Sequence, residues 1–158
     1  MKKLVFRLLI VGLMAIVFSQ CDASAQQFWG KTKYGMASAV VKQLFGQKIH
    51  NGDTGAKGST SLQMTTTICD VRFNVHFIFK NDKLIETDLD GQTLPGTTPC
   101  ILTQYYEAYG KPEIAEQGEL GREILFKRGD TVLSISTTVL TSSTDRIFIA
   151  YRIKRTDL

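Results

Sequence analysis

Two histidines are the only imidazole side chains that this chain of 158 residues offers for acid–base chemistry. His76 stands on the polar side of an alternating segment, and Glu86 and Asp88 follow on the next segment. A histidine beside a carboxylate could transfer a proton, which would predict a small secreted enzyme with a concave pocket around His76. The alternation also fits an exposed polar strand position, and we favour that interpretation.

Other patterns that could support catalysis are incomplete. His50 and Asp53 provide too few side chains for zinc, which takes three or four ligands. The glycine-rich segment 52–60 lacks the residue order of a phosphate-binding loop. The segment that starts at Asp88 begins like a calcium loop, but Pro99 occupies the twelfth position, where a glutamate is required. We therefore predict a protein that is not an enzyme, with no catalytic residues, no metal site and no cofactor.

The N-terminus predicts export from the cytoplasm. Three basic residues in the first seven positions precede an uncharged apolar run over 8–18, and a small-residue cleavage site ends at Ala25. An apolar run of this length suits a signal peptide and is too short for a stable membrane-spanning helix. We predict a signal peptide over 1–25 and a single domain over 26–158 that is periplasmic or secreted.

The predicted cleavage changes the charge balance. The whole chain has a formal charge of +4, and removal of 25 of its 158 residues leaves 133 residues with a charge of +2. Much of the basicity therefore belongs to the leader, and we predict no nucleic-acid partner. The remaining length suits one domain with a hydrophobic core, and no later segment is apolar enough to form a transmembrane helix.

Cys21 leaves a second interpretation of the leader open. A lipoprotein signal places a cysteine directly after the apolar run, where it is lipidated and becomes the first residue. The residue before that cysteine is usually small, whereas here it is Gln20. We favour cleavage after Ala25, and lipidation of Cys21 is the alternative that would tether the protein to a membrane.

Two cysteines remain after the predicted cleavage. In an oxidising compartment, an even pair in a small domain favours a disulfide, here between Cys69 and Cys100. Two buried free thiols are the alternative. A catalytic role for Cys100 would need a histidine base, and the sequence places neither histidine beside it.

Hydrophobic periodicity shows which elements must position these residues in the first half. We expect Phe28 and Trp29 against the core, followed by a helix over 35–46. Its apolar face is formed by Ala37, Val40, Val41 and Leu44 at helical spacing. After a glycine-rich loop over 50–60, alternation predicts three strands, over 60–68, 71–80 and 83–90, with a tight turn at Asn81-Asp82 between the last two.

The second half repeats this order. A loop over 91–98 leads to a helix with Thr98 as N-cap and Pro99 at its first position. The apolar stripe of this helix consists of Leu102, Tyr105, Tyr106 and Tyr109, and Gly110 ends it. Three further strands are predicted over 122–127, 131–139 and 146–154. The sequence therefore predicts an α+β fold of order α-β-β-β-α-β-β-β, with an antiparallel sheet and both helices packed on one face.

One motif and this order resemble a known group. The spacing of Gly35-Met36, Val41 and Leu44-Phe45-Gly46 resembles the first helix of the small envelope proteins grouped as SmpA/OmlA and β-lactamase-inhibitor-like folds. The tandem helix-plus-three-strand order is similar to that group as well. The serine cap, acidic first turn and following proline usual there are absent here. The resemblance implies binding of another protein, or support of outer-membrane assembly and maintenance as a lipid-anchored protein, without catalysis.

These observations predict an exported, non-catalytic protein of the bacterial envelope or exterior. We expect it to bind a protein or envelope component through the sheet face that the helices leave open. Interfaces often combine cationic, polar and aromatic side chains. The predicted binding residues on that face are Arg72, Asn74, His76, Lys80, Phe148 and Arg152.

Overall fold

The computed structural model describes residues 28–53, 58–93, 96–119, 121–141 and 144–154 of the chain. The predicted signal peptide, its cleavage site and Cys21 lie outside these ranges. None of the described helices is both long enough and apolar enough to cross a membrane.

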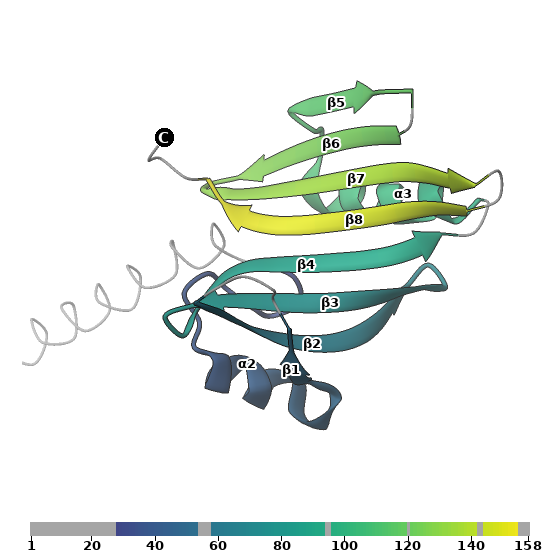
Figure 1. The fold of residues 1–158 in the computed structure, drawn as a ribbon. Coiled ribbons are helices and arrows are strands. Elements are labelled where there is room, and N and C mark those ends of the chain that lie inside the picture. The colour runs from purple at the N-terminus through teal and green to yellow at the C-terminus, as the bar shows by residue number, and fades with distance from the viewer. Residues whose placement is uncertain (1–27, 54–57, 94–95, 120, 142–143, 155–158) are drawn as a thin grey trace, which may run out of the picture.

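The described chain is mainly an antiparallel sheet with two α-helices (Figure 1). The sheet has eight strands in the order β1-β2-β3-β4-β8-β7-β6-β5. The elements of the first half are α2 (Ser38–Phe45), η1 (Gly46–Lys48), β1 (His50–Gly52), β2 (Ser59–Ile68), β3 (Val71–Lys80) and β4 (Lys83–Thr93). Those of the second half are α3 (Thr97–Tyr109), β5 (Ile114–Gln117), β6 (Gly121–Arg128), β7 (Thr131–Thr141) and β8 (Thr144–Ile153). The predicted α+β class with an antiparallel sheet is confirmed.

Each half contains one strand more than the sequence predicted. β1 lies in the predicted loop over 50–60, whose residues 54–57 are outside the described ranges. β5 is an edge strand in which every residue is exposed. Both strands are too short to show a period-two pattern of apolar residues. In β5, moreover, neither side of the strand is buried, so no alternation is expected. The two halves meet where β4 pairs with β8 in the middle of the sheet.

β4 also extends past the predicted strand end, through Gly91 to Thr93. Gly91 is buried, opposite Phe73 on β3 and Ile147 on β8. A Cβ atom at Gly91 would lie 2.8 Å from the ring of Phe73. Glycine therefore accommodates the phenylalanine ring here and is not a turn residue, so the loop predicted from residue 91 is wrong at its start.

The alternation in β3 is confirmed and supplies much of the core. Its odd positions are almost wholly buried: Val71, Phe73, Val75, Phe77 and Phe79. Neighbouring strands add apolar residues in register with them, so that Leu62 of β2 lies opposite Phe77 and Leu89 of β4 lies opposite Val75. β8 contributes Ile147, Ile149 and Tyr151 to the same core.

α2 contacts this core through a different face from the predicted one. Val41 is buried as expected, but Val40 and Leu44 are each 42% exposed. The ring of Phe45 lies 5.2 Å from that of Phe77 and 5.8 Å from that of Trp29. Packing of this large aromatic side chain turns the Val41–Phe45 side of the helix inward, and Val40 and Leu44 face outward.

α3 begins two residues earlier than predicted and has a different cap. Gly96 is the N-cap, in a left-handed conformation and without a side-chain hydrogen bond. Thr98 lies inside the helix, and its hydroxyl donates to the hydroxyl of Thr93 at 3.3 Å. Pro99 remains in the first turn, where no backbone donor is required. Tyr105 is buried as expected, together with Ile101, which the predicted stripe omitted.

Two tyrosine contacts join α3 to the second half of the sheet. The ring of Tyr106 lies 5.6 Å from that of Phe126 on β6. The hydroxyl of Tyr151 on β8 donates to the hydroxyl of Tyr105 at 3.2 Å. Burial raises the pKa of Tyr105 to about 12, so this pair stays neutral and hydrogen-bonded at ordinary pH.

The predicted disulfide between Cys69 and Cys100 is present. Cys69 lies in the tight turn between β2 and β3, and Cys100 lies near the start of α3. The side-chain amide of Gln104 donates to the sulfur of Cys69 at 3.4 Å. The bridge therefore fixes the first half of the sheet to the helix that opens the second half, and it leaves no free thiol at Cys100.

Candidate functional site

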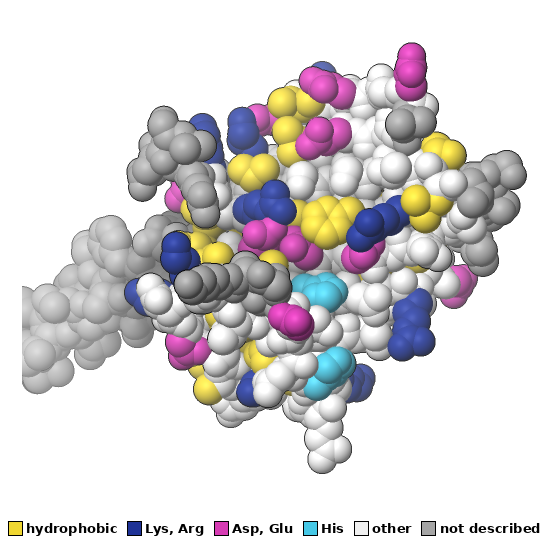
Figure 2. Space-filling model, in the orientation of Figure 1, with side chains coloured by type: hydrophobic (Ala, Val, Ile, Leu, Met, Phe, Trp, Pro, Cys, Tyr) yellow, Lys and Arg dark blue, Asp and Glu magenta, His cyan; other side chains and the backbone are white. Residues whose placement is uncertain are grey.

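The even positions of β3 lie on the sheet face opposite the phenylalanines. With their neighbours in register, they form what we call the polar face: the side chains that point away from the aromatic core on β2, β3, β4, β8 and β7. Figure 2 shows acidic and basic side chains next to one another across the middle of this face, with histidine side chains on the same face below them. The close pairing of opposite charges is its most regular feature.

Three carboxyl groups stand in a row along β4 on the polar face. Glu86, Asp88 and Asp90 alternate with buried residues, which places them at successive positions of the same side. Across the sheet on β8, Arg152 lies opposite Glu86, and the two form an ion pair. Arg146 donates from two nitrogens to the two oxygens of Asp90, at 2.8 and 2.7 Å. Each outer carboxylate of the row is therefore neutralised by an arginine.

Asp88, the middle carboxyl, has a different environment. Its neighbours in register are His76 on β3 and Ala150 on β8, so no arginine stands opposite it. Asp88 is only 9% exposed, and its Oδ1 atom is buried and has no hydrogen-bond partner among the described residues. Burial, then the negative charge of Glu86 and a hydrogen bond with it, raise the pKa of Asp88 to about 8, although Arg152 acts in the opposite direction.

The raised pKa of Asp88 predicts that the protein loses stability as the pH rises. The folded protein keeps the Asp88 proton up to about pH 8, whereas the unfolded chain releases it near the ordinary value of 3.8. Between these values the free energy of unfolding should therefore fall with pH, by at most about 1.4 kcal/mol per unit for one proton.

We expect Asp88→Asn to remove this contribution, because asparagine cannot ionise, and to make the protein more stable than wild type at pH 8. Urea denaturation of both proteins from pH 5 to pH 9 measures the effect. Asp90→Asn, two residues away on the same strand, should retain the wild-type slope. Equal slopes in wild type and Asp88→Asn would contradict the assignment.

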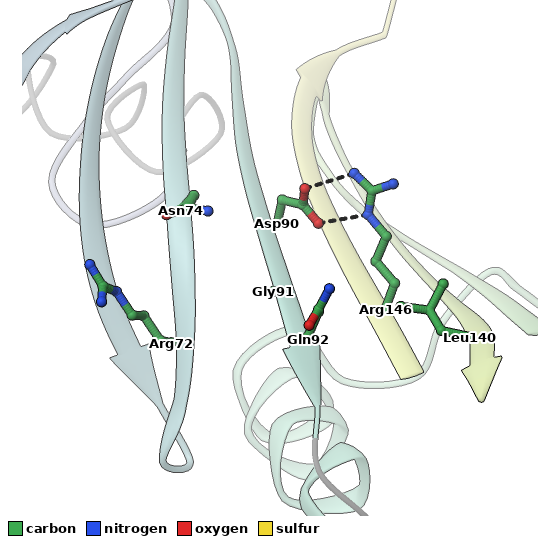
Figure 3. A pocket seen from close by; sticks show the side chains of 7 residues that line it. All are labelled: Arg72, Asn74, Asp90, Gly91, Gln92, Leu140 and Arg146. Carbon is green, nitrogen blue, oxygen red and sulfur yellow. Dashed lines mark hydrogen bonds and ion pairs between the residues drawn. The ribbon is translucent and has the colours of Figure 1, made fainter. Parts of the chain in front are cut away.

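Beside the carboxyl row, the polar face contains a shallow depression of about 680 Å³ (Figure 3). Arg146 and its partner Asp90 line one side, and Arg72 and Asn74 of β3 line the other. Gly91, Gln92 and Leu140 complete the lining. Figure 3 shows the Asp90–Arg146 pair joined across β4 and β8, with the Arg72 side chain directed away from it. The depression offers amide and guanidinium groups that could form hydrogen bonds with a partner.

The structure brings most of the predicted binding residues to this region. Arg72 and Asn74 line the depression, His76 is half-buried opposite Asp88, and Phe148 is half-buried opposite Asp90. Arg152 belongs to the ion pair with Glu86. Lys80 differs from the others, because it is the last residue of β3 and pairs with Lys83 at the hairpin end.

Sequence reasoning missed Asp90, Gln92 and Arg146 as members of the site. The sequence pattern predicts that the strand ends at Asp90 and that a loop follows from residue 91. The decisive contact joins β4 to β8, strands separated in the chain by α3, β5, β6 and β7. The opposite charges of Asp90 and Arg146 were visible, but only the order of strands in the sheet places them together.

The hypothesis of a His76-based enzyme places His76 beside a carboxylate of the next strand and predicts a concave pocket around the histidine. His76 and Asp88 are neighbours across the β3–β4 hairpin. The depression in the described surface, however, is lined by residues other than His76. Among the described residues there is also no group of three or more histidine, cysteine, aspartate and glutamate side chains that could hold a metal ion.

Comparisons of the chain with protein-family models, with curated proteins and with solved structures find no match.

Proposed function

We propose that this is an exported, non-catalytic protein of the bacterial envelope or exterior that binds another protein through the polar face of its sheet. The observation that carries the proposal is the row of paired charges on β4 and β8, together with half-buried Phe148 beside it. Aromatic and arginine side chains contribute most of the binding energy at many protein interfaces.

The proposal includes an arrangement in which α2 and α3 cover one face of the sheet and leave the polar face accessible. Phe45 of α2 contacts Phe77, and Tyr106 of α3 contacts Phe126. By strand register, Phe77 and Phe126 belong to the core side of the sheet. Both helices therefore have their aromatic contacts on the side opposite Arg72 and Phe148.

Preorganisation supports a binding role for the polar face. The two hydrogen bonds from Arg146 to Asp90 hold both side chains in one geometry before any partner arrives. Fixing such side chains in advance lowers the conformational entropy that binding would otherwise cost, about 0.5–1.5 kcal/mol for each immobilised side chain. A partner that matches this charge pattern would gain affinity without reorganising the sheet.

Export is part of the same proposal. Removal of residues 1–25 would leave Gln26 as the first residue, and the alternative is a lipidated Cys21 that tethers the domain to a membrane. The mass of the purified mature protein distinguishes the two, because lipidation retains residues 21–25 and adds acyl chains.

We expect substitutions on the polar face to release the partner protein. Arg72→Glu and Phe148→Ala should each reduce its recovery at least tenfold in a cross-linking pull-down from intact cells, because each removes a side chain of the interface type. Lys111→Glu makes the same charge change in the exposed connection after α3 and should retain the partner. Unchanged recovery with both polar-face variants would contradict the proposal, provided that they melt at the wild-type temperature.

A further inference from the structure

Among the described residues, the carboxyl row on β4 has three acidic positions and two arginines that form ion pairs with them. Arg152 pairs with Glu86 and Arg146 pairs with Asp90, whereas Asp88 lies opposite Ala150 on β8 and His76 on β3. The charged and titratable groups around Asp88 are His76 from β3, Glu86 and Asp90 from β4, and Arg152 from β8. A third cation is the missing element of this pattern.

The Oδ1 atom of Asp88 indicates the position of that cation. It is a buried acceptor with no partner, in a residue that is 91% buried (9% exposed). A buried acceptor without a hydrogen bond destabilises the folded protein, and a ligand that donates a hydrogen bond to it would remove this cost. Ala150 is fully buried, so a donor reaches Asp88 only when the Arg152 side chain, which is 52% exposed, moves aside.

We propose that Asp88 binds a cationic side chain, a lysine ammonium or an arginine guanidinium, which the protein partner inserts between Arg152 and Phe148. This inference rests on the proposed function and specifies the chemistry of the partner. The inserted cation completes the row of three ion pairs. Phe148 lies on the same side of β8 as Ala150, and its ring would add a cation–π contact to the bound cation.

Binding of such a cation is coupled to loss of one proton. The neutral Asp88 carboxyl releases its proton to solvent, and the resulting carboxylate forms an ion pair with the incoming ammonium or guanidinium group. No other bond changes. Affinity for the cation should therefore increase with pH up to the pKa of the free carboxyl, by at most tenfold per pH unit for one proton.

Titration with a penta-lysine peptide tests this site directly. Isothermal calorimetry at low salt from pH 6 to pH 9 should show affinity that rises five- to tenfold per unit up to about pH 8, with release of about one proton per peptide at pH 6 and almost none at pH 9. In Asp88→Asn the rise and the proton release should be lost. Because this variant retains His76, the difference between the two proteins reports Asp88 alone. Asp90→Asn removes a neighbouring carboxylate and should keep the pH dependence.

The results separate this inference from the proposed function. No binding of penta-lysine, or identical pH dependence in wild type and Asp88→Asn, would overturn the cation site. In the pull-down, a partner that is lost with Phe148→Ala but fully retained by Asp88→Asn would also overturn it and leave the proposed function standing. If every polar-face variant retained the partner, the proposed function itself would be contradicted. A last outcome combines two results: spermidine binds with the same pH dependence as penta-lysine, and Asp88→Asn retains the protein partner. Together they would assign the site to a free amine and overturn the proposal.

Discussion

Truncation of Phe77 to alanine is expected to lower the free energy of unfolding by about 3–5 kcal/mol, the range for buried aromatic residues. Phe77 is completely buried in β3, and its ring contacts those of Phe45 and Trp29. Removing the ring leaves a cavity and also loosens α2, which packs on the sheet through Phe45. Urea denaturation followed by tryptophan fluorescence is suited to this measurement, because Trp29 is the only tryptophan of the chain.

The neighbouring residue supplies the matched control. Ile78 follows Phe77 in β3 but lies half-buried on the polar face. Ile78→Ala should cost about 1 kcal/mol or less, since it removes a side chain that is already partly in water. Equal losses at the two positions would contradict the assignment of one buried and one accessible face to β3.

Loss of the disulfide is expected to have the second largest effect. The double substitution of Cys69 and Cys100 by alanine should lower the free energy of unfolding by about 3–4 kcal/mol on the chain-entropy estimate for their separation of 31 residues. The bridge joins the β2–β3 turn to α3, so its removal frees contacts between the two halves of the fold. Denaturation midpoints of the oxidised protein and the double variant give the difference.

A control separates the bridge from its surroundings. Gln104→Ala removes the hydrogen bond to the Cys69 sulfur but leaves the disulfide, and its cost should stay within about 0.5 kcal/mol, as for other exposed positions. A double variant with the same midpoint as the oxidised protein would show that the bridge adds no stability.

The sequence predicted the parts of the fold that local patterns encode. The strict alternation of Val71–Lys80 identified β3 and both of its faces, and Asn81-Asp82 identified the hairpin turn that follows it. The disulfide was predicted because an even pair of cysteines remains after the predicted cleavage. The strand and its turn depend on residues that are close in sequence. The disulfide has only one possible pairing between the two cysteines that follow the predicted leader.

Features set by tertiary contacts were missed. The side of α2 that faces the core depends on Phe45 packing against Phe77, and helical spacing alone placed Val40 and Leu44 inward. Gly91 looked like a turn residue because its role depends on the nearby ring of Phe73.

The candidate site followed the same pattern. Arg72, Asn74 and His76 were predicted from strand alternation, which needs no knowledge of neighbours. The unpaired state of Asp88 depends on Ala150 standing opposite it, and this requires the pairing of β4 with β8. Only the order of the strands in the sheet therefore reveals which carboxyl lacks a cation.

The central claim is that the polar face is the binding face, and position-specific photo-cross-linking in intact cells tests it most directly. A photoreactive amino acid in place of exposed Asn74 lies on the polar face, and one in place of exposed Thr103 lies on α3. We expect a single cross-linked protein from position 74 and none from position 103. A cross-link from position 103 with none from position 74 would contradict the claim.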